Sequence, residues 1–475
     1  MPGEPPPCAL APFSLRDIVV IMKRFLLLLI ALPLVAGAQN QDNAADLSKV
    51  MPSDNQGWDE ARILETAEAR IQQHRTGAAE IRVLGRDGKP LANTAVRVRL
   101  VRHEFLLGCN AFPLGPVLKR GLDPAARQTY GERFAALLNY ATLPFYWSYY
   151  EPEPGQTGEA DVREMAAWCR ERGIAVKGHP LAWHETFPVW AKELPDDEVR
   201  RLQTERITDL VRRFKGTVDR FDVINEATVS AKFDNAIGRW VKERGAANLS
   251  ADFLKLAHEA NPDAELLYND FNVSADFEQL VADLLQQQAP FHAVGIQSHM
   301  HKELWPVEKL WTVCETYARF GKPLHFTELT ILSGRFKPKD DNDWHTVHTD
   351  WDTTPEGEQR QLEYGRKVYT VLFSHPAVDT ITWWDFSDRN SWAGAPAGLL
   401  RKDMSPKPLY DWLVEAFHQT WSTDVVVQSD ASGTVRLRAF YGDYELTAKD
   451  GTGGSLGWKV SFAKQGPARL QAELR

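Results

Sequence analysis

The chain has 475 residues, of which 43% are apolar and 25% charged, so it can bury a large core and shows no compositional bias toward disorder. Its formal net charge of -9 provides no basic surface for phosphates, and we expect no nucleic-acid partner. The 16 tryptophans fit either a large core or a site that stacks on sugar rings.

The N-terminus carries the pattern of a processing segment. From Met22 the sequence "MKRFLLLLIALPLVAGA" combines a basic start, an apolar run and a small-residue cleavage site. It predicts a signal peptide over residues 22–38, with cleavage after Ala38. The apolar run is shorter than the roughly 20 residues that span a bilayer, so we expect no membrane anchor and a secreted or periplasmic protein. Residues 1–21 are predicted to be upstream sequence before a true start at Met22.

Two flanking segments, residues 39–104 and 421–475, have the character of short strands. A helical pattern covers residues 43–76, and the next stretch, "AEIRVLGRDGKPLANTAVRVRLV", alternates on both sides of an Asp-Gly turn, which predicts a β-hairpin. The C-terminal segment has similar alternating strands broken by Gly and Asp. Neither flank has enough strands to be stable alone, so we expect the two to pair into one small β module.

Between the flanks, residues 105–420 alternate apolar runs with amphipathic helical patterns such as "SADFEQLVADLLQQQ". Eight parallel strands with intervening helices predict an α/β fold, a (β/α)8 TIM barrel whose site lies at the C-terminal ends of the strands. The runs that predict these strands are 105–112, 140–147, 175–183, 220–227, 265–272, 293–299, 323–330 and 380–386.

Two glutamates fall at predicted strand ends. Glu226 ends the fourth run, "RFDVINEA", and Glu328 lies near the end of the seventh, "PLHFTELT". Two carboxyl groups across a barrel mouth suit glycoside hydrolysis, in which one protonates the leaving oxygen and the other attacks the sugar or activates water. Either glutamate alone would more simply be a solvated loop carboxylate. The pair, with His and Trp at neighbouring strand ends, favours catalysis.

Six sequence blocks within residues 105–420 resemble glycoside hydrolase family 10, the endo-β-1,4-xylanase family. They are "GHPLAWHETFPVW", "FDVINEA", "LYNDFN", "GIQSHM", "HFTELTI" and "WWDFSDRNSW", and they occur in the family's order. The resemblance implies a retaining double displacement with Glu226 as acid/base and Glu328 as nucleophile. Their carboxyl groups would then lie about 5 to 5.5 Å apart.

The resemblance also implies a sugar cradle around the two glutamates. Asn225 would hydrogen-bond the sugar 2-hydroxyl, although a strand-end turn cap is the alternative role for it. His299 would orient Glu328, and Gln297 would support the same network. The other implied substrate-binding residues are His179, Trp183, Trp384, Trp392 and, at an altered position, Tyr146.

Substrate choice is where the chain departs from the family pattern. On the second predicted strand, Thr142, Leu143 and Tyr146 stand where the family has a sugar-binding Glu, Asn and Lys. A hydrogen-bonding pocket beside the reacting sugar thus becomes apolar and aromatic, so plain xylan recognition there is expected to be weakened or altered. Further departures replace the family's Gln, Asp and Gly with Thr186, Thr330 and Asp385.

A long polar loop, residues 332–357, follows Glu328 and carries Trp344, Trp351 and two histidines. Loops of this length in compact barrels are usually functional or disordered. Its position beside the predicted nucleophile favours a lid or an extra sugar platform, and a solvated insertion is the alternative.

Histidines offer a rival interpretation as metal ligands, in the pairs His179 with His184 and His299 with His301. Neither pair has a third ligand at a plausible spacing, so we expect no metal and no cofactor. The cysteines of the mature chain lie in apolar stretches and are expected to be buried free thiols: Cys109, Cys169 and Cys314.

The sequence therefore predicts an exported, monomeric β-glycanase, with cleavage of β-1,4-xylosidic bonds in xylan as the leading activity. The first alternative is a β-glycosidase of the same mechanism that acts on a decorated xylan or another plant β-glycoside. The second, from another class, is a carbohydrate-binding protein of low activity, which the intact glutamate pair argues against.

Overall fold

The computed structural model describes residues 57–115, 122–449 and 454–474. The predicted signal peptide, the upstream segment 1–21 and the first part of the predicted helix 43–76 lie outside these residues. Two short helices, α3 (Glu60–Glu65) and α4 (Ala67–His74), form the rest of that helix. Among the described residues, no helix is both long and apolar enough to cross a membrane.

Eight parallel strands close into a barrel, as predicted. β11 pairs with both β3 and β10, which closes the ring. The short strand β9 (His299–Met300) extends the pairing of β10 at its C-terminal end. The barrel strands are β3 (Leu106–Asn110), β4 (Tyr140–Pro144), β5 (Ala175–His179), β6 (Arg220–Asn225), β7 (Glu265–Asp270), β8 (Ala293–Ile296), β10 (Leu324–Ile331) and β11 (Val378–Trp383).

Helices between these strands cover the barrel with their apolar faces. In α12, for example, Phe277, Leu280, Val281 and Leu284 recur at helical spacing and are buried. β10 is buried at every position, because a barrel strand has side chains inside the barrel and others under the helices. The barrel helices include α5 (Pro124–Leu137), α7 (Glu159–Glu171), α8 (Asp196–Arg213), α10 (Ala236–Arg244), α11 (Ala246–Ala260), α12 (Ala275–Gln286), α13 (Val307–Ala318), α14 (Pro355–Ser374) and α15 (Pro408–Glu415), with short α6 (Trp147–Tyr150) and α9 (Ala227–Ser230).

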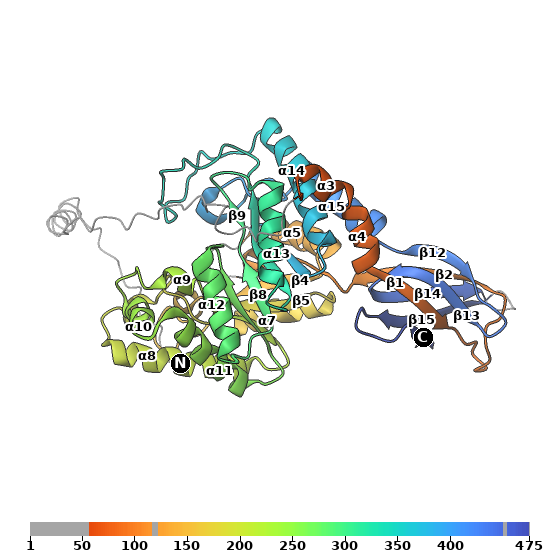
Figure 1. The fold of residues 1–475 in the computed structure, drawn as a ribbon, viewed down its shortest axis with the longest axis horizontal. Helices are drawn as coiled ribbons and strands as arrows, with labels where there is room; N and C mark the ends of the chain where they lie inside the picture. Colours follow the sequence, from red (N-terminus) through yellow and green to blue (C-terminus); the bar gives the residue numbers. More distant parts are fainter. Residues whose placement is uncertain (1–56, 116–121, 450–453, 475) are drawn as a thin grey trace, which may run out of the picture. The chain divides into compact units, whose positions relative to one another are not determined.

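The two flanks form small sheets together, but the predicted hairpin is wrong. β1 (Thr76–Arg82) and β2 (Ala95–His103) lie in different sheets, and the turn between them closes with a bridge of Leu84 to Pro90. Each strand pairs instead with C-terminal strands, which Figure 1 shows in blue beside the orange N-terminal ones. This arrangement lets two sheets bury a shared apolar core, which a lone hairpin cannot do.

The two sheets have defined strand orders. The three-stranded sheet has the order β13-β1-β16, and the five-stranded sheet has the order β12-β2-β14-β15-β17. The C-terminal strands are β12 (Asp424–Gln428), β13 (Thr434–Phe440), β14 (Gly442–Lys449), β15 (Ser455–Phe462), β16 (Arg469–Gln471) and β17 (Glu473–Leu474).

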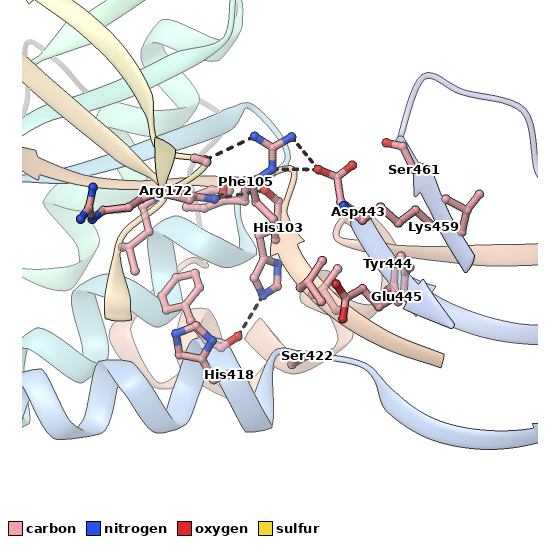
Figure 2. Close-up of a pocket in the computed structure, with 18 of the residues that line it drawn as sticks. His103, Phe105, Arg172, His418, Ser422, Asp443, Tyr444, Glu445, Lys459 and Ser461 are labelled. Carbon is pink, nitrogen blue, oxygen red and sulfur yellow. Dashed lines mark hydrogen bonds and ion pairs between the residues drawn. The ribbon is translucent and has the colours of Figure 1, made fainter. Parts of the chain in front are cut away.

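A pocket of about 720 Å³ lies where β2 and β14 meet the segments that lead into the barrel strands (Figure 2). Arg102 Nε donates to Asp443 at 2.8 Å, and His103 Nε2 lies 3.1 Å from the backbone oxygen of Phe417. The lining residues around β3 and β4 lie before those strands or, for Leu107, at the start of β3, so the pocket is at the N-terminal ends of the barrel. In this fold that end serves stability, and the chemistry is expected at the other end.

Candidate active site

The residues predicted for the site lie at the C-terminal ends of the barrel strands or in the segments that follow. β5 ends at His179, β6 ends at Asn225, and Glu328 lies in the last half of β10. The short 3-10 helix η3 (Trp392–Gly394) begins with Trp392. Those that follow a strand closely are Tyr146 after β4, Trp183 after β5, Glu226 after β6, Gln297 after β8 and Trp384 after β11, and His299 lies in β9.

Glu226 is held by three side chains. It follows β6 directly with left-handed dihedrals, φ 56° and ψ 39°, and caps the short helix α9. Trp183 Nε1 donates to its Oε2 at 3.0 Å, while Gln297 Nε2 and Asn225 Nδ2 donate to its Oε1 at 2.8 and 3.1 Å. Gln297 also donates to Asn225 Oδ1 at 3.2 Å, and Asn269 donates to both Asn225 and Glu328, so Gln297 belongs to the network that reaches Glu328.

The surroundings of Glu226 favour its protonated form. Burial raises the pKa of this carboxyl well above its usual range, although the hydrogen bond from Gln297 lowers it. The negative charges of Asp270, Glu185 and Glu328 raise the pKa further. A carboxyl group in this state can donate a proton near neutral pH.

The surroundings of Glu328 favour its ionised form. Its Oε1 accepts a hydrogen bond from Asn269 Nδ2 at 2.8 Å, and its Oε2 lies 3.1 Å from His299 Nε2. Burial by itself raises the pKa of this carboxyl, yet three neighbours outweigh burial and lower it. They are His179, His299 and Lys177. The site therefore holds one carboxyl group that favours its proton and one that favours its charge.

Asn269 connects the two halves of the site and was not among the predicted residues. Its Nδ2 donates to Asn225 Oδ1 at 2.8 Å as well as to Glu328, and its Oδ1 accepts from Thr327 Oγ1 at 2.6 Å. Every polar atom of this buried amide is therefore used. Its block "LYNDFN" supplied the available signal, because amides are rare within a buried strand.

A buried ion pair beneath the site was also missed. Lys177 Nζ and His179 Nδ1 lie 2.6 and 2.7 Å from the same oxygen of Asp222, and all three side chains are buried. This contact leaves His179 Nε2 on the side of Glu328, 3.9 Å from its Oε1. The sequence did carry a signal for this ion pair, namely charged residues inside the buried runs "AVKGH" and "RFDVIN". Charged residues are rarely buried unless they are paired.

Aromatic rings line the mouth beside these carboxyl groups. Phe112, Tyr146 and Trp384 form one buried cluster, and Trp183 and Trp392 pack against it. The rings of Phe112 and Trp384 meet edge to face at 5.6 Å. Such surfaces can stack on the apolar faces of sugar rings.

The residues that depart from the family pattern on β4 and β10 are buried or contact the site histidines. Thr142 and Leu143 in β4 are fully buried, and Tyr146 contacts the His179 ring edge to face at 5.3 Å. Thr330 Oγ1 lies 3.0 Å from His299 Nδ1, so a hydroxyl group meets this imidazole.

The histidines considered as metal ligands have other contacts. His184 Nδ1 lies 2.7 Å from Ser230 Oγ, and the His301 ring packs on Trp344 and Trp392. Within the described parts of the chain, no group of three or more His, Cys, Asp or Glu side chains could hold a metal ion. The predicted thiols are free and buried, as expected: Cys109, Cys169 and Cys314.

The closed parallel barrel and its carboxyl pair define the chain as a TIM-barrel protein with the architecture of a glycoside hydrolase. Residues 138–416 match the family described as Glycosyl hydrolase family 10, and the chain belongs to that family.

Known proteins with related sequences include endo-1,4-β-xylanases and an anti-sigma-I factor. Endo-1,4-beta-xylanase B of Paenibacillus barcinonensis is 30% identical over 304 residues, which is 60% of this chain and 86% of that protein. Anti-sigma-I factor RsgI6 of Acetivibrio thermocellus is 24% identical over 439 residues, 90% of this chain and 51% of that protein. The chain thus spans about half of that relative, and 29% of Endo-1,4-beta-xylanase 1 of Arabidopsis thaliana.

Solved structures share the fold. Native xylanase 10B from Thermotoga maritima has a TM-score of 0.55 and 22% identity, covering 67% of this chain and 97% of that one. An endoxylanase from a sugarcane soil metagenome has a TM-score of 0.56 and 19% identity, covering 66% and 97%.

Proposed function

We propose that the chain is a retaining endo-1,4-β-xylanase, in which Glu226 is the acid/base and Glu328 the nucleophile. The observation that carries this proposal is the opposite direction of their pKa shifts, raised for Glu226 and lowered for Glu328. A double displacement needs a proton donor and an ionised nucleophile at the same pH. Several relatives of this chain are endo-1,4-β-xylanases, which supports the choice of substrate.

In the first step, the Glu328 carboxylate attacks the anomeric carbon while Glu226 gives its proton to the glycosidic oxygen. The glycosyl ester that forms removes the negative charge of Glu328, so the pKa of Glu226 falls as that residue becomes the base. Glu226 then takes a proton from the water that attacks the ester, and both carboxyl groups return to their starting states.

Asn225 and His179 suit the positioning of the reacting sugar. Asn225 is bonded to Asn269 and Glu226, and these contacts hold its amide beside the acid/base, which supports a role in binding the sugar 2-hydroxyl. His179 has one nitrogen on Asp222 and the other toward Glu328.

The test uses an aryl β-xyloside with a good leaving group and unsubstituted xylan. Glu328→Ala should lose activity on both substrates by at least about a thousandfold, because no ester can form. Glu226→Ala should lose activity on xylan but still give a burst of aryl alcohol, since a good leaving group needs no proton. Full activity of Glu328→Ala on either substrate would overturn the assignment.

A second candidate function is favoured by the aromatic mouth. Thr142 and Leu143 are buried, and Tyr146 adds an apolar ring beside His179, so a substituted xylan or another plant β-glycoside would suit this surface better than bare xylose hydroxyls. Products from substituted but not from unsubstituted xylan, resolved from a panel of plant polysaccharides, would favour this candidate.

We further propose that the protein is exported as a monomer after cleavage following Ala38. The basic start and apolar run of residues 22–38 support export. The mass of the protein recovered outside the cytoplasm should match a chain that begins at Gln39, and size-exclusion chromatography should give the mass of one chain. An intact N-terminus in the recovered protein would contradict the export proposal.

A further inference from the structure

The loop between β10 and α14, residues 332–354, is anchored to the segment that carries Trp392. Trp351 is 1% exposed and packs with Leu332, Ala395 and Ala397 in a cluster apart from the main core. Its Nε1 donates to the backbone oxygen of Arg335 at 2.8 Å. A loop with its own buried tryptophan and a satisfied indole group is a folded element and not a solvated insertion.

Backbone contacts join this loop to η3 and the residues after it. The His348 amide donates to the Ala393 oxygen at 2.9 Å, and the Ser333 amide donates to the Pro396 oxygen at 2.9 Å. Gly394 has φ +71°, and a Cβ there would meet the His348 oxygen at 2.1 Å. The two segments therefore approach as closely as a glycine allows.

Trp344 lies on Trp392. Their ring centroids are 5.1 Å apart with an interplanar angle of 26°, a stacked arrangement. Trp392 also contacts the His299 ring at 5.0 Å, and His299 bonds Glu328. Trp392 is thus in contact with the loop through Trp344 and with the carboxyl site through His299.

The surroundings of Trp344 fix its ring in turn. His301 is buried and meets the rings of Trp344 and Trp392 edge to face at 5.4 and 5.0 Å. The Lys337 amide donates to the His301 oxygen at 2.9 Å, and the ammonium groups of Lys337 and Lys302 lie 5.2 and 5.7 Å from the Trp344 ring centroid. Cations over an indole face and edge-to-face rings both stabilise a defined ring position.

We propose that Trp344 is a positioning residue for Trp392, so that residues 332–354 hold one aromatic wall of the sugar site in place before substrate binds. This inference rests on the proposed function, because it takes Trp392 to face the sugar. If Trp392 is already ordered, substrate binding does not lose the entropy of ordering it. Loss of Trp344 should therefore weaken substrate binding more than it slows the chemical steps.

The test compares Trp344→Ala, Trp344→Phe and Val347→Ala, the last a 62% exposed residue of the same loop. We expect Trp344→Ala to raise KM for xylo-oligosaccharides about five- to tenfold, in proportion to one lost aromatic contact, with kcat changed less than about twofold. Trp344→Phe should recover most of the KM, and Val347→Ala should match the parent protein.

Hydrogen–deuterium exchange of residues 391–397 gives a readout that needs no turnover. Exchange there should be faster in Trp344→Ala than in the parent, with other strand-end segments unchanged. The proposal would be overturned by unchanged exchange at residues 391–397 in Trp344→Ala. It would also be overturned if kcat fell by as large a factor as KM rose, or if Val347→Ala showed the same changes. A parent protein that cleaves none of the substrates would instead refute the proposed function, while the exchange result would still decide the role of Trp344.

Discussion

Gln297 limits how far the pKa of Glu226 rises above its usual value. Glu328 must be ionised and Glu226 protonated, so kcat/KM should follow a bell-shaped pH profile with an acidic limb from Glu328 and a basic limb from Glu226. The amide of Gln297 stabilises the charged form of Glu226 and lowers its pKa. Gln297→Leu should therefore move the basic limb to higher pH, as measured with a soluble aryl β-xyloside.

The matched control is Gln359→Leu on the exposed face of α14, where the amide bonds Glu363. This variant should keep the parent profile. A basic limb that stays in place or moves to lower pH in Gln297→Leu would contradict the assignment of Glu226 as the acid.

Asp222 offers a second residue-scale prediction, on stability. Replacing it with Asn leaves the buried Lys177 ammonium without its charge partner, and His179 loses its carboxylate acceptor. Removing one partner of a buried pair typically costs about 3–5 kcal/mol. Urea unfolding should show a loss of this size in Asp222→Asn, while Asp263→Asn, whose pair with Lys215 is exposed, should lose less than about 1 kcal/mol.

The same pair gives stability a pH dependence with a definite sign. Burial raises the pKa of Asp222, but Lys177 and His179 outweigh burial and lower it below the usual value. A carboxyl group with a lowered folded-state pKa stabilises the protein above its unfolded pKa, and this contribution is lost as the pH falls through the folded pKa. The stability difference between the parent and Asp222→Asn should therefore be largest near neutral pH and shrink in acid. A constant difference across that range would contradict this account.

At the scale of elements, the eight barrel strands and the placement of Glu226 and Glu328 were predictable because buried parallel strands are continuous apolar runs. The sheet partners of β1 and β2 were not predictable, because pairing between the two ends of the chain leaves no local signal in the sequence. An Asp-Gly turn does leave such a signal, and it favoured the hairpin. The contacts of Lys177 and Asn269 were likewise beyond the sequence, because their partners come from other strands.

A strand-scale prediction concerns Gly178 in β5. A Cβ at this position would lie 2.6 Å from the Phe221 ring and 2.9 Å from that of Phe145, so Gly178→Ala overpacks the barrel next to His179. Such overpacking typically costs about 1–3 kcal/mol, and thermal unfolding should show a lower Tm. Gly457→Ala in β15, where the nearest atom to a Cβ is 3.9 Å away, should be close to neutral. Equal effects of the two substitutions would contradict this explanation.

At the scale of the whole molecule, Arg75 joins the β module to the barrel. Its guanidinium group is buried and donates to the backbone oxygens of Phe373, His375 and Val378 at 2.6, 2.7 and 2.5 Å. Arg75 directly precedes β1, so the first strand of the module starts from a fixed point between α14 and β11. The hydrogen bonds of Arg75 therefore attach the module to the barrel, in addition to the covalent connection of the chain.

The module itself depends on both ends of the chain. β1 pairs with β13 and β16, and β2 pairs with β12 and β14. A chain that ends at residue 422 would keep β1 and β2 but lose every one of these partners. It would expose their backbone edges and the buried apolar side chains of Ile81, Val96 and Val98. Unpaired apolar strands of this kind associate with one another.

We expect the chain ending at residue 422 to elute as large aggregates in size-exclusion chromatography, even though its barrel strands are complete. A chain that lacks residues 473–475 is the control, because β17 is exposed and pairs with β15 at one edge of its sheet, and it should elute and unfold like the full chain. A soluble chain ending at residue 422 with an unchanged Tm would show that the barrel folds without the module. Aggregation limited to that chain would show that the C-terminal strands are needed to cover the N-terminal ones.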